Sequence, residues 1–221
     1  MISVALSPKE AGRDVVLKAN LTVGEKSVSA TFTFGIVKYA EKIINDGSDI
    51  EKTLVCDVLS YIRAAYAYFE TEDANIVAKI NAVLGKNYDE NNAPALNGST
   101  VAPTEGLESV TFVLDAEPTI RFYLASGVDA TAYKFYIDGV KVNTVSGVNS
   151  NGTYIDIDTY AYAVSKTLTY TIYDFEAGSF NIAAYYEWAK MQNNDALVTL
   201  VARFIKYSES AEAYRCSVVD Q

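Results

Sequence analysis

The chain of 221 residues contains no histidine, and this absence narrows its chemistry more than any residue it has. Without an imidazole, the sequence excludes Ser-His-Asp and Cys-His nucleophilic pairs, a histidine-ligated zinc or copper site and a histidine proton shuttle. The sequence also lacks a glycine-rich phosphate loop and a CxxC pair. No catalytic residues, metal or other cofactor are therefore expected, and any catalysis would rest on Asp, Glu, Tyr, Lys or Arg.

Basic residues are also scarce, since 18 Lys and Arg stand against 28 Asp and Glu, for a net charge of −10. Nucleic acids and anionic membrane surfaces both require a basic footprint, so neither is an expected partner. The sequence has no apolar run of the ~20 residues that a membrane span needs. It has no signal peptide at its start either, which favours a cytosolic protein or a piece of a larger secreted one. The only cysteines, Cys56 and Cys216, are expected to be buried or half-buried thiols, and a disulfide between them is the alternative.

One segment of the sequence occurs twice. Residues 33–69 and 179–215 align without a gap at a constant offset of 146, and 12 of the 37 positions are identical. Self-similarity at a fixed spacing predicts duplicated structural units. Each copy is predicted to form two helices, broken near Gly47 in the first copy and near Asn193 in the second. Thr33 and Ser179 are the expected N-caps of the first helix in each copy.

Strand patterns precede both pairs of helices. Between residues 107 and 172 about six runs alternate with period two, and Asp138-Gly139 predicts a hairpin turn. The first copy has only three such runs, at residues 2–6, 15–21 and 28–32. We therefore predict an α+β fold with antiparallel β-sandwich-like sheets and packed helical hairpins, in two related units. The boundaries are residues 1–84 for the first unit, 85–106 for a linker and 107–221 for the second unit.

The first unit is predicted to lack its leading strands. A truncated sheet leaves an open edge that can pair with another chain. We expect strands upstream in the natural chain to complete it, with the second unit or a partner strand as the alternatives, so self-association is possible.

Recurring tyrosines in the two copies are expected to pack in the core with satisfied hydroxyls, because they fall at apolar helical positions. They are Tyr39, Tyr61 and Tyr68 and their counterparts Tyr185, Tyr207 and Tyr214.

The helix boundaries of the first unit carry a family resemblance. The segments 34–39 and 61–69 resemble the Ser-Val-x-x-Tyr helix start and the Tyr-Gly-Ala-Ala-Ala-Gln-x-Tyr-Phe helix end of a C-terminal region of large surface or secreted proteins of Gram-positive gut anaerobes. Ile62 and Tyr66 depart from that pattern, where the family has a small residue and Gln. The resemblance covers nearly the whole chain. It implies a secreted or cell-surface, modular setting beside glycan-associated domains, and no catalytic residues are carried over from it.

Nine residues are candidates for ligand binding. Aromatic and hydrogen-bonding side chains on the outward positions of the strands of the second unit suit sugar rings, whose C–H faces stack on aromatic rings. The alternative is a solvated sheet face whose Tyr and Thr reflect β propensity. On the strands and their turns the candidates are Arg121, Tyr123, Lys134, Tyr136, Asp138, Tyr154, Asp156 and Tyr173. The ninth, Trp188, is on a predicted helix, where it marks either a contact surface or part of the core.

Three functions follow from these observations. The leading one is a non-catalytic module of an extracellular protein, which binds glycan or acts as a structural or adhesive element. The second is a polysaccharide-cleaving glycoside hydrolase that uses a pair of carboxylates, for which a cleft lined by two carboxylates and aromatic residues between the units is expected. The third is a protein–protein module that pairs through an open sheet edge.

Overall fold

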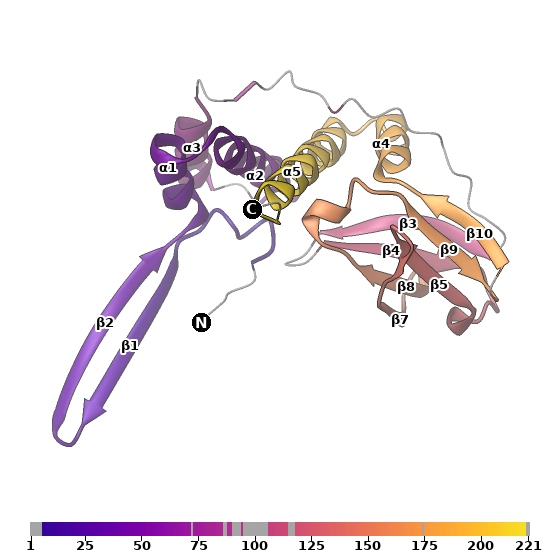
Figure 1. Ribbon diagram of the computed structural model, residues 1–221, viewed down its shortest axis with the longest axis horizontal. Helices are drawn as coiled ribbons and strands as arrows, with labels where there is room; N and C mark the ends of the chain where they lie inside the picture. Colours follow the sequence, from indigo (N-terminus) through magenta and orange to yellow (C-terminus); the bar gives the residue numbers. More distant parts are fainter. Residues whose placement is uncertain are drawn as a thin grey trace.

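The structure is a computed structural model that describes residues 6–71, 73–85, 88–89, 94, 106–114, 118–173 and 175–219, without the side chains of residues 176 and 177. It confirms the α+β class, with five α-helices and three antiparallel sheets among these residues. Figure 1 shows three parts side by side: a projecting two-stranded ribbon, a central group of helices and a β-sandwich. The helices are α1 Ile36–Asp46, α2 Asp49–Tyr68, α3 Ala74–Leu84, α4 Ile182–Met191 and α5 Asp195–Val219.

The sandwich is built from two four-stranded antiparallel sheets with the orders β3-β4-β8-β7 and β10-β9-β5-β6. Side chains that alternate along the strands, such as Phe122, Phe135 and Tyr170, meet between the sheets, and the first two have no exposed surface. The strands are β3 Leu107–Leu114, β4 Pro118–Leu124, β5 Tyr133–Ile137, β6 Val140–Lys141, β7 Thr144–Asn149, β8 Gly152–Asp158, β9 Leu168–Ile172 and β10 Phe175–Phe180.

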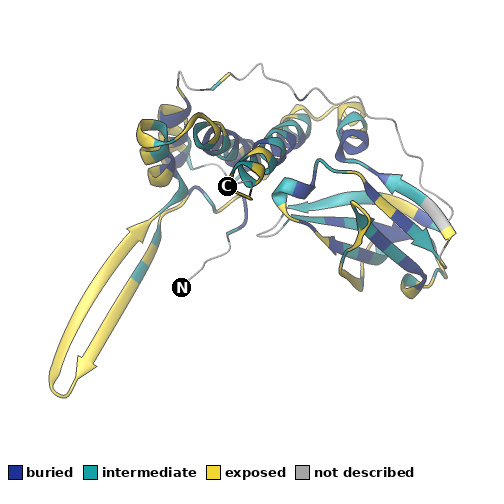
Figure 2. Cartoon of the chain, in the orientation of Figure 1, coloured by how far each residue is buried: buried dark blue, intermediate teal, exposed yellow. Residues whose placement is uncertain are grey.

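The ribbon consists of β1 Val15–Val23 and β2 Lys26–Phe34, which pair only with each other among the described residues. It stands apart from both cores, and Figure 2 shows it exposed along almost its whole length. The strands are longer than the sequence predicts. β2 runs on to Phe34, so Gly35 and not Thr33 precedes α1, and in the same way Asn181 and not Ser179 caps α4. The expected strand at residues 2–6 lies outside the described residues except Leu6, which is not in a strand.

The helices link the two predicted units. α2 packs along α5, and the ring of Tyr61 stacks on Phe204 and Tyr207 with centroid distances of 5.0 and 5.8 Å. A capping box at Ser48 starts α2, since the Ser48 side chain accepts from the backbone N–H of Glu51 and the Glu51 carboxylate accepts from that of Ser48.

The recurring tyrosines do not all lie in the core as predicted. Tyr61 and Tyr185 are buried, whereas Tyr39, the counterpart of Tyr185, is 55% exposed. Neither cysteine forms a disulfide, and Cys56 is buried whereas Cys216 is exposed.

Candidate functional site

The outer face of the β3-β4-β8-β7 sheet carries a compact polar and aromatic cluster. The register pairs Arg121 of β4 with Asp156 of β8, and the guanidinium donates two hydrogen bonds of 2.7 Å to the two carboxylate oxygens. The same guanidinium lies over the ring of Tyr154, with Cζ 3.8 Å from the ring centroid. The hydrogen-bonded carboxylate raises the pKa of Arg121. This ion pair is internally satisfied, and it covers one face of the Tyr154 ring.

Tyr123 is the second aromatic residue of this cluster. Its ring meets that of Tyr154 edge-on at 6.2 Å, and its hydroxyl accepts a 3.1 Å hydrogen bond from Asn149. Hydrogen bonding to Asn149, followed by Asn151, lowers the pKa of Tyr123. Tyr123 is only 8% exposed, so little of its ring faces solvent.

A glycine on the edge strand makes room for this arrangement. A Cβ added at Gly147 of β7 would lie 2.5 Å from the hydroxyl oxygen of Tyr154 and 2.6 Å from its Cζ. The Tyr154 ring therefore lies directly against the backbone of β7, which an alanine at position 147 would prevent. Aromatic side chains that cover cross-strand glycines stabilise sheets in this way.

The remaining predicted ligand residues lie elsewhere. Lys134 and Tyr136 are on β5, in the other sheet of the sandwich. Asp138 forms the β5–β6 turn and accepts a 2.7 Å hydrogen bond from Lys166. Tyr173 is in the β9–β10 turn and 65% exposed, and Trp188 is on α4 and 44% exposed. The nine residues therefore divide between two sheets, two turns and a helix, and only Arg121, Tyr123, Tyr154 and Asp156 come together.

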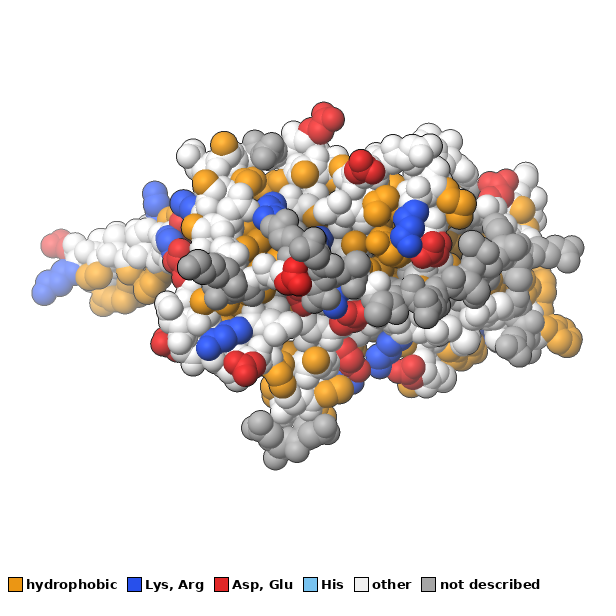
Figure 3. All heavy atoms as spheres, turned by 90° about the horizontal axis from the view of Figure 1, so that it is seen from above, with side chains coloured by type: hydrophobic (Ala, Val, Ile, Leu, Met, Phe, Trp, Pro, Cys, Tyr) orange, Lys and Arg blue, Asp and Glu red, His pale blue; other side chains and the backbone are white. Residues whose placement is uncertain are grey.

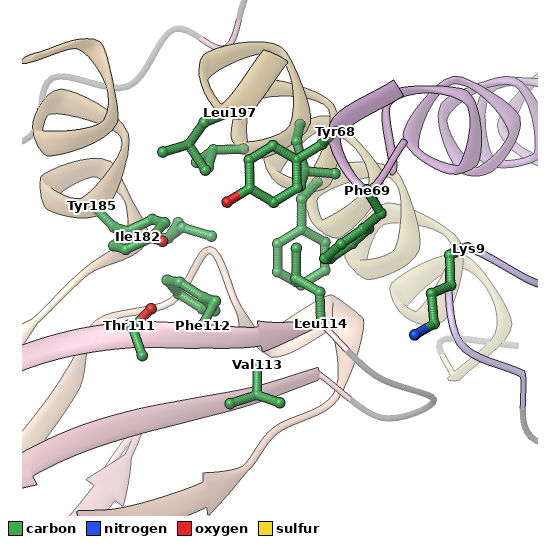
Figure 4. Close-up of a pocket in the computed structure, with 13 residues that line it drawn as sticks. Lys9, Tyr68, Phe69, Thr111, Phe112, Val113, Leu114, Ile182, Tyr185 and Leu197 are labelled. Atoms are coloured by element: carbon green, nitrogen blue, oxygen red, sulfur yellow. The ribbon is translucent and has the colours of Figure 1, made fainter. Parts of the chain in front are cut away.

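A cavity of about 350 Å³ lies where the end of α2 meets the second unit (Figure 4). Tyr68 and Phe69 approach it from α2, Phe112 from β3 and Tyr185 from α4, and the last two rings meet edge-on at 4.8 Å. Its other described lining residues are Lys9, Thr111, Val113, Leu114, Ile182, Leu197, Leu200, Val201 and Phe204. The described lining contains no carboxylate, so this cavity is not the carboxylate-lined cleft that a glycoside hydrolase would place between the units.

A second, polar cavity of about 280 Å³ opens between α2 and α5, and sequence analysis missed it. Asp57 lines it and is only 4% exposed. Burial raises the pKa of this carboxyl, although a hydrogen bond from Ser210 and the charge of Lys206 oppose the shift. Lys206 also pairs with Glu209 at 3.0 Å. The signal in the sequence was a lone carboxylate between the apolar residues of α2. Asp89, Glu209 and Tyr88 line the same cavity, so carboxylates and an aromatic residue come together between a helix of the first unit and a helix of the second. The lining expected of a glycoside hydrolase is therefore found in this cavity and not in the first one.

The described part of the chain holds no group of three or more Cys, Asp or Glu side chains that could bind a metal ion. Within the same residues, no helix combines the length and apolar character needed to cross a membrane.

No protein-family profile matches this sequence, and no curated protein or solved structure shows significant similarity to it. The function is therefore argued from the geometry of the chain itself.

Proposed function

We propose that the chain is a non-catalytic structural or adhesive module that associates with another β-structured element through the β1–β2 ribbon. The observation that carries this proposal is that one face of the ribbon is apolar from the Val15–Phe34 pair to the Leu21–Val28 pair, with Lys26 only at its tip, and is largely open to solvent. The extracellular, multimodular setting is part of the proposal and rests on the family resemblance.

The cross-strand register sorts the ribbon side chains by face. One face carries the pairs Val15–Phe34, Leu17–Phe32, Ala19–Ala30 and Leu21–Val28, and the opposite face carries mainly Lys, Asn, Ser and Thr. On the apolar face Leu21, Val28 and Phe32 are 66%, 68% and 56% exposed. Apolar surface of this extent on one flat face marks an interaction site or an aggregation liability. Figure 3 shows the hydrophobic side chains along one side of the projecting ribbon.

The charge of the ribbon also suits association. Its only charged residues are Lys18, Glu25 and Lys26, which sum to +1, whereas the whole chain carries −10. Repulsion between acidic surfaces opposes contact over most of the molecule. The ribbon projects beyond that acidic body, so a partner meets its apolar face without facing a like charge.

The same geometry disfavours the glycan-binding alternative at the β4–β8 cluster. A sugar ring needs a free aromatic face, yet Arg121 covers one face of Tyr154 and Tyr123 is almost buried. Selective removal of the protein from solution by an insoluble polysaccharide would contradict this assignment.

Sedimentation velocity over a concentration series tests the proposed association. In the absence of a partner, the open faces of two ribbons should bury against each other, so the unmodified chain should show weak, concentration-dependent self-association. The double variant Leu21→Ser/Val28→Ser replaces one apolar cross-strand pair and should remain monomeric.

The matched control is Thr22→Ala/Ser27→Ala, the neighbouring cross-strand pair on the polar face, which should associate as the unmodified chain does. A strictly monomeric unmodified chain, or equal association of both double variants, would refute a docking role for the apolar face.

A further inference from the structure

The ribbon and the two helices after it have counterparts in the second unit. The order hairpin, helix, helix occurs as β1-β2-α1-α2 and again as β9-β10-α4-α5. Phe34 and Phe180 hold the same position in the repeated sequence, and they pair across their hairpins with Val15 and Leu168. Val15 of the first hairpin therefore corresponds to Leu168 of the second.

The turns that lead into the two hairpins match as well. The backbone N–H of Glu10 donates to the carbonyl of Ser7 at 2.9 Å, and that of Ala163 donates to Tyr160 at 2.8 Å. Three residues later, Arg13 donates to Glu10 at 2.9 Å and Lys166 donates to Ala163 at 3.1 Å. Residues 7–15 thus share these two turn hydrogen bonds with residues 160–168 at a constant offset of 153.

The two hairpins differ in what covers them. On the β9–β10 hairpin, Leu168, Tyr170 and Phe180 are 1%, 2% and 7% exposed. At the positions of Phe180 and Tyr185, the first unit has Phe34 and Tyr39, which are 48% and 55% exposed.

In the second unit, the cover comes from the strands that precede β9. Phe112 of β3 lies between Phe180 and Tyr185, with ring centroids at 6.0 and 4.8 Å. β5 pairs antiparallel with the edge of β9 that β10 leaves open, with Tyr133 opposite Ile172 and Ile137 opposite Leu168. The β3–β8 strands therefore cover the inner face of β9 and pair with its free edge.

We infer that β1–β2 is the two-stranded part of a β-sandwich that is completed by a partner unit of the same kind as β3–β8, supplied from outside the 221 residues. This inference rests on the proposed function and specifies the partner. Such a unit places a β5-like strand antiparallel on the open edge of β1. It also places an aromatic side chain, as Phe112 does, between Phe34 and Tyr39.

A second copy of this chain fits the ribbon less well. Its own β3–β8 strands already cover its β9–β10 hairpin, so it offers only a second ribbon. Two ribbons stacked face to face overlap over roughly 30 Å by 10 Å, from nine residues and two strand spacings. That footprint of roughly 300 Å² is well below the ~800 Å² per partner of a stable interface, and it leaves the edge of β1 unpaired.

The test adds a second copy of the β3–β8 strands to the full chain. A second copy of residues 106–159 is joined directly before Ser7 in place of residues 1–6, because residue 159 precedes Tyr160, the counterpart of Ser7. Amide hydrogen exchange of peptides from residues 15–34 should slow by about tenfold or more, as expected when exposed strands enter a core. The control carries the same added segment with the copies of Phe112 and Phe122 changed to Ser, and its ribbon should exchange as in the unmodified chain.

Two outcomes overturn the inference. If the added strands leave ribbon exchange unchanged while the unmodified chain still self-associates through the ribbon, the partner is of another kind although the proposed function stands. If the unmodified chain forms a dimer whose ribbon is as protected as in the lengthened chain, the occupant is a second copy. A monomeric unmodified chain with no effect of Leu21→Ser/Val28→Ser refutes the proposed function itself.

If the lengthened chain does not fold, a peptide-binding assay tests whether the ribbon accepts a β5-like strand. A labelled peptide with the sequence of residues 130–139, which contains β5, should bind the unmodified chain saturably in fluorescence anisotropy. A scrambled peptide of the same composition should not bind. Equal behaviour of the two peptides would overturn the inference.

Discussion

Phe180 and Phe34 offer a matched pair of substitutions that tests how differently the two hairpins are covered. They occupy corresponding positions at the ends of β10 and β2, directly before the N-cap residue of the first helix of each unit. Phe180 is 7% exposed, and its ring centroid lies 6.0 Å from that of Phe112 and 5.8 Å from that of Phe122. Phe34 is 48% exposed.

The expected costs follow from these environments. Phe180→Ala removes a ring from a closed aromatic cluster and leaves a cavity, which should lower the free energy of unfolding by about 3–5 kcal/mol. Phe34→Ala removes a ring that is only about half buried. Full burial of such a side chain stabilises by about 1.5–3 kcal/mol, so the loss here should be roughly 1 kcal/mol, without a cavity.

Urea unfolding measures both variants against the unmodified chain, followed by far-UV circular dichroism and by tryptophan fluorescence. The single tryptophan, Trp188, stacks on Tyr185 at 5.0 Å and therefore reports on the second unit. Unchanged slopes with denaturant concentration would show that the substitutions act on stability alone. Equal costs for the two variants, or a larger cost for Phe34→Ala, would refute the claim that the ribbon face is open.

Three further outcomes are expected. Burial raises the pKa of Asp57, so the folded state loses stability as the pH rises through that raised pKa. Asp57→Asn should therefore stabilise the chain at pH 7, and thermal melts should show that this gain vanishes in acid. Gly147→Ala should displace the Tyr154 ring and cost about 1 kcal/mol, and a double-mutant cycle should show the cost disappear in a Tyr154→Ala background. Hydrogen bonding to Arg215 lowers the pKa of Glu212 to about 2, so the ionised carboxylate stabilises the fold fully above its ordinary pKa, and this stabilisation is lost as the pH falls toward 2. Glu212→Gln should therefore lower the free energy of unfolding by roughly 1 kcal/mol at pH 7 and leave it unchanged at the acid end of a pH series of thermal melts.

Strands with clear period-two alternation were predictable from the sequence. The runs at residues 133–137 and 168–172 match β5 and β9 residue for residue, because their inward and outward positions differ sharply in polarity. β10 was missed. Its sequence contains Gly178 and Ser179, which suggest a loop and a helix cap, whereas a bulge between residues 176 and 178 accommodates it in the sheet.

The composition of the candidate site was less predictable than the strands. Alternation shows which side chains point outward, but it does not show which strands share a sheet. Lys134 and Arg121 both lie on outward positions, yet they belong to different layers of the sandwich. The pairing of Arg121 with Asp156 depends on the register of β4 and β8, which are separated by three other strands in the chain.

The open ribbon was predictable in part. The sequence indicates a sheet with few strands before the first helices and an exposed edge. It does not show that the hairpin projects away from α1, because that depends on which residues are present to cover its apolar face. The repeat therefore points to similar local structure in both units, while burial is decided by the strands around each hairpin.

Amide hydrogen exchange of the unmodified chain tests the central claim most directly. Peptides from residues 15–34 and 168–180 report on the two corresponding hairpins in one experiment. An open β1–β2 ribbon should exchange much faster than the covered β9–β10 hairpin at concentrations where the chain is monomeric. Equal protection of the two hairpins under those conditions would contradict the account.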